Sequence, residues 1–252
     1  MQFKNIMNKS IIYNVVVGMN IALIACNPQS HESRPASESV NIQDNITDCK
    51  VATNTVTFTN ALNGADKYVN VLDNGALEFK CPEGLDFFID PNEGKLTNIT
   101  LPALLTKVDN TKPFTFTAKV TPEFTPDGLY NAADLLVYAN DSLWQKLCFE
   151  QDEYGSHRIV SVRTDGTSDD NNHDKLDVKS VFLKISSDTR TIASYYSIDN
   201  NEWHMVRLYK NYYPDSLYVG VSSQCPKHGS CTSLIEDVTL NVDNVKDFRM
   251  GK

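Results

Sequence analysis

The sequence predicts an all-β fold in which two antiparallel sheets pack as a sandwich. From residue 51 onward, short runs of alternating apolar and polar residues are separated by turn residues, with almost no helical periodicity. About eleven such runs follow one another at short spacing, which is typical of antiparallel sheets and not of βαβ units. The roughly 200 residues involved suit one sandwich domain better than two small ones.

The clearest predicted strand is Phe114–Val120, because its apolar residues alternate with polar ones and define one buried face. Before it, the strands Tyr68–Leu72 and Ala76–Phe79 are joined by an Asp-Asn-Gly turn. The segment 164–177 is rich in Asp, Asn and Ser, and it is predicted to be a long exposed loop. The remaining predicted strands cover residues 56–59, 133–138, 143–150, 157–163, 179–186, 191–197, 203–209, 216–222 and 234–242.

The first 26 residues have the pattern of a secretory signal. Lys4 and Lys9 precede an apolar stretch, Ile11–Ile24, and a small residue, Ala25, stands directly before Cys26. The apolar stretch is shorter than the roughly 20 residues that a membrane span requires. The Leu-x-Ala-Cys ending resembles a lipobox, which predicts that Cys26 is lipidated and becomes the mature N-terminus.

Three regions are therefore expected: a lipoprotein signal at 1–26, a flexible polar tether at 27–50 and the sandwich at 51–252. Asn27, rather than Asp, follows the cysteine, which favours the outer membrane of a Gram-negative cell envelope. The net charge of −9 argues against nucleic acid and anionic membrane surfaces as partners.

Five cysteines remain after processing, and some are expected to pair in an oxidising compartment. Cys225 and Cys231 flank a turn-like stretch, which predicts a disulfide between them. A zinc site made of Cys225, His228 and Cys231 is the alternative, but no fourth ligand lies nearby in the sequence. Cys49 with Cys81 is another conceivable pair, and Cys148 is expected to be a buried thiol within a strand.

Several segments resemble one known family, and they occur in order over roughly residues 55–249. That family is the concanavalin A-like family of unknown function found in regulation-of-enolase proteins, related to a C-terminal domain of some β-xylosidases. The resembling segments are Leu85–Pro91, Phe114–Phe116, Ala133–Val137, Leu143–Glu150, Ser161–Thr164, Phe182–Lys184, Tyr196–Trp203 and Tyr218–Val221.

The resemblance implies a concanavalin A-like jelly roll with one concave face, and it supplies no activity. The sequence departs from the family at two places. Lys184 stands where relatives often have Arg, so a bidentate carboxylate contact is lost there, and Asp199-Asn-Asn201 replaces an Asp-Gly turn.

Strand alternation places Leu147 and Phe149 in the core and directs Trp144, Lys146 and Glu150 to the opposite surface. If the neighbouring strands lie in one sheet, their outward residues form an aromatic and charged patch suited to stacking on sugar rings and hydrogen bonding to hydroxyls. The predicted carbohydrate-binding residues are Trp144, Lys146, Glu150, Phe182, Lys184, Tyr196 and Arg207, with Met205 beside them. An ordinary solvated sheet face is the alternative interpretation.

Catalysis is the minority interpretation. A glycoside hydrolase needs two carboxylates flanking the bond, and Glu150 with Asp152, Asp199 or Glu202 is the nearest candidate set. A third interpretation is an interaction module that docks on partner envelope proteins. No cofactor or metal is expected, although the oxygen-rich stretch 165–174 leaves calcium as a minor option.

Overall fold

The computed structural model describes residues 45–252, and the predicted signal, Cys26 and most of the predicted tether lie outside this part. Within it the chain is almost entirely strand and loop, with one 3-10 turn, η1 (Ala65–Tyr68). No helix in residues 45–252 is long and apolar enough to cross a bilayer.

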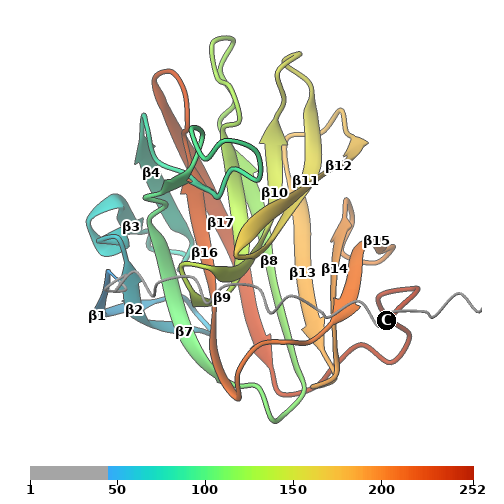
Figure 1. Cartoon of the computed structure of the whole chain (residues 1–252). Coiled ribbons are helices and arrows are strands. Elements are labelled where there is room, and N and C mark those ends of the chain that lie inside the picture. The colour runs from blue at the N-terminus through green and yellow to red at the C-terminus, as the bar shows by residue number, and fades with distance from the viewer. Residues whose placement is uncertain (1–44) are drawn as a thin grey trace, which may run out of the picture. The chain divides into compact units, whose positions relative to one another are not determined.

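Two large antiparallel sheets account for most of this part of the chain (Figure 1). The eight-stranded sheet has the order β1 (Ile46–Ala52), β2 (Thr57–Leu62), β7 (Ala103–Asp109), β16 (Ser216–Gln224), β9 (Ala132–Asn140), β10 (Leu143–Gln151), β11 (His157–Asp165) and β12 (Thr167–Lys175). The seven-stranded sheet has the order β15 (His204–Lys210), β14 (Thr191–Ser197), β13 (Val181–Ser187), β8 (Phe114–Pro122), β17 (Ser230–Asn241), β4 (Leu77–Pro82) and β3 (Val69–Val71).

The main core lies between these sheets, because each sheet directs one set of alternating side chains toward the other. Phe116 of β8 and Leu183 of β13 meet Leu147 of β10 and Val219 of β16 in one buried cluster. Burying these apolar surfaces is the dominant stabilising contribution, at roughly 25 cal/mol per Å². The expected all-β sandwich of two antiparallel sheets is confirmed.

A second apolar cluster lies on the outer face of the eight-stranded sheet. It is covered by segment 85–101, which contains the small hairpin β5 (Phe87–Phe88) and β6 (Asn98–Ile99). The ring of Phe87 lies 5.0 Å from that of Trp144, and both side chains are fully buried. Segment 85–101 therefore packs onto a face that a simple sandwich would leave open to solvent.

Three strands of the eight-stranded sheet differ from the prediction. Segment 164–177 contains β12, which pairs with β11 along the edge of the sheet, although it was expected to be a loop. An edge strand needs little apolar surface, so its polar composition hid it. The strand β1 includes residues 46–50, which were assigned to the tether, and β7 was not predicted.

Candidate ligand-binding site

The outer face of the eight-stranded sheet carries a buried polar cluster beside the second apolar core. On β10, Trp144, Lys146 and Glu150 point away from the main core, as the alternation predicts, whereas Leu147 and Phe149 point into it. The side chains are nevertheless covered: Trp144 is 0%, Lys146 2% and Glu150 7% exposed. The expectation of an open aromatic patch at Trp144 is therefore wrong, because segment 85–101 covers it.

Lys146 is held by two partners from different parts of the fold. Its Nζ donates to Oδ1 of Asp86, at 2.7 Å, and to Oε1 of Gln224, at 2.7 Å. Asp86 belongs to segment 85–101, and its Oδ1 also accepts a hydrogen bond from the backbone amide of Phe87. The ion pair therefore attaches this segment to β10.

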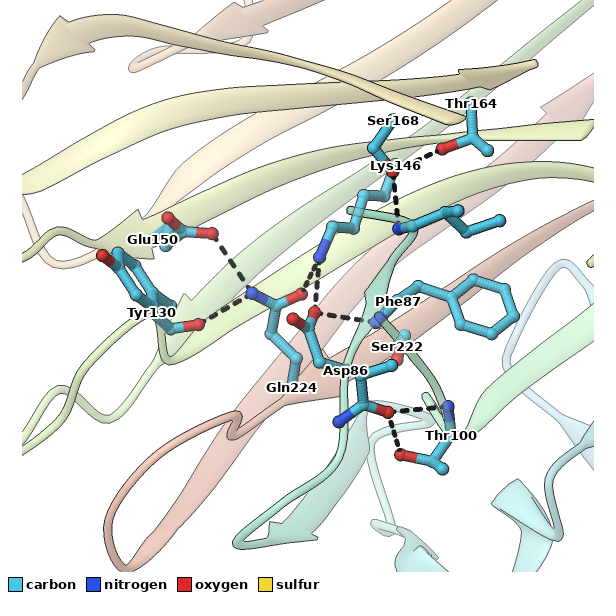
Figure 2. Close-up of polar contacts among 12 residues, drawn as sticks. Asp86, Phe87, Thr100, Tyr130, Lys146, Glu150, Thr164, Ser168, Ser222 and Gln224 are labelled. Atoms are coloured by element: carbon cyan, nitrogen blue, oxygen red, sulfur yellow. Dashed lines mark hydrogen bonds and ion pairs between the residues drawn. The ribbon is translucent and has the colours of Figure 1, made fainter. Parts of the chain in front are cut away.

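Gln224 links Lys146 to a carboxyl group on the same strand, as Figure 2 shows. Its Nε2 donates to Oε2 of Glu150, at 3.1 Å, and to the carbonyl oxygen of Tyr130, at 2.7 Å. The oxygen and the nitrogen of the Gln224 side-chain amide thus both have hydrogen-bond partners, which fixes the orientation of the amide group. We call Asp86, Asp134, Lys146, Glu150 and Gln224 the Lys146 cluster.

Strand register brings these side chains together. Ala132 of β9 lies between Glu150 of β10 and Gln224 of β16 in the paired strands. Two residues further along β9, Asp134 is opposite Cys148 on one side and Ser222 on the other. Residues in such lateral rows share one face of the sheet, so Asp134 of β9 and Gln224 of β16 lie beside Lys146 and Glu150 of β10.

Asp134 is the least satisfied member of the cluster. Its side chain is fully buried, and neither carboxylate oxygen has a hydrogen-bond partner of good geometry. Burial raises the pKa of Asp134 to about 7, although the charge of Lys146 and the neighbouring Cys148 thiol act in the opposite direction. A buried polar group without a partner is costly, so Asp134 is a candidate to bind a ligand or water.

Burial also raises the pKa of Glu150 well above its ordinary value, and Lys146 offsets only part of this effect. Burial alone would lower the pKa of Lys146, but Asp86 and the other nearby acidic groups raise it, so the ammonium stays charged. The side chain of Asp170 on β12 is accessible to solvent, yet the surrounding protein raises its pKa by desolvation. The cluster therefore combines one fixed cation with two buried carboxyl groups, Asp134 and Glu150, whose pKa values are raised by burial.

The rim of the cluster is accessible. Tyr130 is 38% exposed, and Asp170 is also exposed. Together with Glu150 these residues offer an aromatic ring, hydrogen-bond acceptors and a carboxyl group whose pKa is raised by burial. Such a mixture suits a ligand whose hydroxyl groups both donate and accept hydrogen bonds.

The other predicted site residues do not join this cluster. Because β13 pairs with β8 and β14, Phe182, Lys184 and Tyr196 belong to the seven-stranded sheet. Tyr196 points into the main core, and its hydroxyl donates to Asp174 at 2.6 Å. Phe182 packs on the other face of that sheet with Met205. The single patch assumed from the sequence is therefore divided between two sheets.

Arg207 lies on β15, after an irregularity in the β14–β15 pairing that leaves Val206 without a partner. The extra residue reverses the alternation after Val206, so Arg207, which was predicted to point outward, points toward the eight-stranded sheet. The guanidinium group donates to Ser161 of β11 at 3.0 Å and to Asp169 of β12 at 3.1 Å. It joins the two sheets and does not contact the Lys146 cluster.

Lys184 is packed against the C-terminal segment. Its Nζ lies 3.5 Å from the ring centroid of Trp203 and donates to the carbonyl oxygen of Gly251 at 3.0 Å. Burial, and then the charge of Lys252, lower the pKa of Lys184 to about 8. These contacts attach the C-terminal segment to the sheet, so we interpret Lys184 as a structural residue.

The carboxylates considered for hydrolysis are separated. Asp152 is held by Arg158, whose Nε donates to it at 2.8 Å, and backbone amides lower its pKa despite burial. Asp199 accepts hydrogen bonds from the backbone amides of Asn201 and Glu202 in the β14–β15 turn. Glu150 lies on β10 of the eight-stranded sheet, whereas this turn joins two strands of the seven-stranded sheet, and the hydrogen-bond partner of Glu150 is Gln224.

The five cysteines in residues 45–252 are free thiols, so the predicted Cys225–Cys231 disulfide is not present in the structure. No group of three or more His, Cys, Asp or Glu residues in this range is arranged to hold a metal ion. Most of the stretch 165–174, considered above for calcium, belongs to the strand β12. A strand directs successive side chains to opposite faces, so neighbouring acidic residues there do not converge on one point.

A surface cavity of about 250 Å³ lies elsewhere, lined by residues 53–55, 74–76 and 236–239. Its Glu236 carboxylate is paired with Lys119 at 3.2 Å. None of the predicted site residues lines it.

Sequence reasoning missed four residues of the site: Asp86, Tyr130, Asp134 and Gln224. Asp134 had a usable signal, since it is the only charged residue in the otherwise apolar run Ala132–Ala139. Asp86 and Tyr130 lie outside the large sheets, where alternation gives no information.

A family model described as a protein of unknown function (DUF1349) matches residues 63–242. The chain therefore belongs to this family of β-sandwich proteins. A search of curated proteins found no match.

Solved structures share the fold. A functionally unknown protein from Saccharomyces cerevisiae has a TM-score of 0.66 and 22% identity, and the match covers 73% of this chain and 96% of that one. The Bacteroides ovatus Xyloglucan PUL GH43B protein has a TM-score of 0.53 and 15% identity, with 79% of this chain and 39% of that chain covered. For a xylan beta-1,4-xylosidase from Bacillus halodurans, the TM-score is 0.52 and the identity 14%, with 76% and 38% covered. The chain thus matches less than half the length of these GH43 proteins.

Proposed function

We propose that this protein is a lipid-anchored envelope protein that binds a glycan, without cleaving it, at the Lys146 cluster. The observation that carries the proposal is a buried set of polar side chains on the sheet face outside the main core, which includes the carboxyl group of Asp134, whose oxygens have no hydrogen-bond partner of good geometry. Buried polar groups require partners, and a polyhydroxylated ligand supplies both donors and acceptors.

The charges of the cluster favour an uncharged sugar. Lys146 is already engaged by Asp86 and Gln224, while the carboxyl group of Asp170 lies at the accessible rim. A uronic acid would bring its carboxylate into a desolvated site beside Asp170 and a lysine that is already paired, which is unfavourable. Neutral xyloglucan and xylan are suitable first probes, since the names of two GH43 proteins with this fold refer to them.

The binding test uses isothermal titration calorimetry with xyloglucan, xylan and, as the charged contrast, polygalacturonate. We expect Asp170→Asn and Tyr130→Ala to weaken binding to a neutral glycan about tenfold or more, equivalent to about 1.4 kcal/mol. Tyr212→Ala is the matched control, since Tyr212 is 59% exposed and contacts Lys210 instead of the cluster. Binding to none of the neutral glycans, or equal binding by all variants, would refute the proposal.

The anchoring part of the proposal rests on the sequence around Cys26. Metabolic labelling with a clickable palmitate analogue in a Gram-negative host tests it. The label is expected on the wild-type chain in the outer-membrane fraction and absent from Cys26→Ala. A labelled Cys26→Ala variant would remove the lipidation assignment.

Hydrolysis is the second candidate, and the raised pKa of Glu150 is the observation that favours it. A raised pKa keeps a carboxyl group protonated to higher pH, which favours a role as general acid. Release of reducing sugar from the same glycans would support this candidate, provided that Glu150→Gln abolishes the release. Activity that survives in Glu150→Gln would exclude Glu150 from the mechanism.

A further inference from the structure

Three buried thiols gather at one end of the sandwich. Cys81 lies on β4, Cys231 lies on β17, and Cys225 directly follows β16. All three are 0% exposed and form one cluster with Leu85. Two strands of the seven-stranded sheet and the segment directly after β16 thus place sulfur atoms in the same buried region.

Cys81 and Cys231 are directly opposite each other in the antiparallel β4–β17 pair. Opposite residues share a face, and their Cα atoms are about 4.5 or 5.5 Å apart in antiparallel sheets. Both values lie within the range of about 4.4–6.8 Å found in disulfides. The backbone therefore already meets the distance requirement for a bond between these two sulfur atoms.

Cys225 has different contacts. Its Sγ lies 3.5 Å from the carbonyl oxygen of His228, within the turn that leads to β17. Its backbone amide donates to the carbonyl oxygen of Leu85 at 3.1 Å, which holds Cys225 against segment 85–101. The Sγ of Cys231 instead lies near Ser233 and the carbonyl oxygen of Ala132. Sequence proximity alone favoured Cys225 with Cys231, whereas register favours Cys81 with Cys231.

We propose that Cys81 and Cys231 form a cross-strand disulfide under oxidising conditions and that Cys225 remains a free thiol. The oxidant is a low-molecular-weight disulfide such as oxidised glutathione. A thiolate of one cysteine attacks it, releasing one glutathione thiol and leaving a mixed disulfide. The second cysteine then displaces the other glutathione, so that two protein thiols are oxidised and one disulfide is reduced.

This bond must form before the cluster is buried. Burial raises the pKa of Cys225 to about 11, and burial also raises the pKa of Cys81 and of Cys231. Because the thiolate is the reacting species, exchange in the folded domain is slow. The reduced, unfolded chain is therefore the correct starting material for a test.

The full chain carrying Cys26→Ser is reduced, unfolded in guanidinium chloride and refolded in a glutathione redox buffer. Free thiols are then alkylated, and peptides are mapped by mass spectrometry without reduction. We expect one linked pair, Cys81 with Cys231, and alkylation of Cys49, Cys148 and Cys225. A link that includes Cys225, or alkylation of both Cys81 and Cys231, would overturn the proposal.

Matched variants separate the bond from general packing effects. Cys225→Ser should keep the linked pair, and its Tm should rise by on the order of 10 °C on oxidation, because the bond closes a long loop. Cys81→Ser should lose both the linked pair and the rise in Tm. An equal rise in Cys81→Ser would contradict the assignment, and the peptide map of the parent chain decides the case if a variant does not fold.

Discussion

The ammonium group of Lys146 lies 2.7 Å from Oδ1 of Asp86, and this contact joins the central strand β10 to segment 85–101. Lys146 is almost fully buried, while the side chain of Asp86 is 16% exposed. The pair therefore lies at the boundary between the buried cluster and solvent. We therefore expect both the stability of segment 85–101 and the shape of the candidate site to depend on it.

Replacing Lys146 tests this dependence. Lys146→Met keeps most of the apolar stem but leaves Asp86 and Gln224 without their donor, so we expect the free energy of unfolding to fall by about 3 kcal/mol. Urea denaturation monitored by circular dichroism measures the change. The double variant with Asp86→Leu should recover part of the loss, because it removes the unpaired charge. Simple addition of the two single effects would show that the residues act independently.

The raised pKa of Asp134 predicts that stability falls as the pH rises. The pKa is about 7 in the folded protein, compared with about 3.9 in an unfolded chain, so the folded state binds more protons between these values. The free energy of unfolding should therefore decrease from pH 4 to pH 7, by at most about 4 kcal/mol from this group.

Urea denaturation at pH 5, 6 and 7 compares Asp134→Asn with the wild type. The amide group introduced by this substitution cannot ionise, so the variant is expected to show a shallower decrease over this range. Glu150, whose pKa is also raised, retains its contribution of the same sign in both proteins. Parallel pH profiles for wild type and variant would show that Asp134 does not titrate in this window.

Trp144 is expected to stabilise the fold and not to act as a sugar platform. The side chain is fully buried against Phe87, and its Nε1 donates to the carbonyl oxygen of Asp141 at 3.1 Å. Trp144→Ala should lower the free energy of unfolding by about 3–5 kcal/mol. Trp144→Phe should retain most glycan affinity in calorimetry. A selective loss of affinity at unchanged stability would instead place Trp144 in contact with ligand.

Lys184 should be unusually reactive for a lysine. Its pKa of about 8 means that much of its amine is neutral at pH 8, where exposed lysines are still charged. Competitive labelling with acetic anhydride, read by mass spectrometry across pH 6–11, gives its midpoint. Lys252→Gln should raise this midpoint, since the charge of Lys252 contributes to the shift. An unchanged midpoint would assign the shift to burial alone.

The sequence predicted the sandwich well because apolar alternation reports burial on one face. In Phe114–Val120 the alternating residues all enter the main core, as predicted. The same signal gave the correct face for Lys146 and Glu150. It failed for β12, whose position at the sheet edge imposes almost no apolar pattern.

The residues that form the site were harder to predict from the sequence, because their grouping depends on which strands are neighbours. Lys184 and Lys146 look equivalent along the chain, yet β13 and β10 lie in different sheets. Arg207 was misplaced by the irregular β14–β15 pairing, which alternation cannot detect. Asp86 comes from a covering segment whose docking is determined by contacts such as Phe87 with Trp144.

Segment 85–101 contributes the acidic partner of Lys146 and caps the apolar half of the same sheet face, but it forms no strand of either large sheet. Under the proposed function, changes in its length or sequence would alter what the face recognises while leaving the strand pairing of both large sheets intact. The same residues would then contribute to binding preference and to local stability, because Asp86 and Phe87 also hold the segment on the sheet.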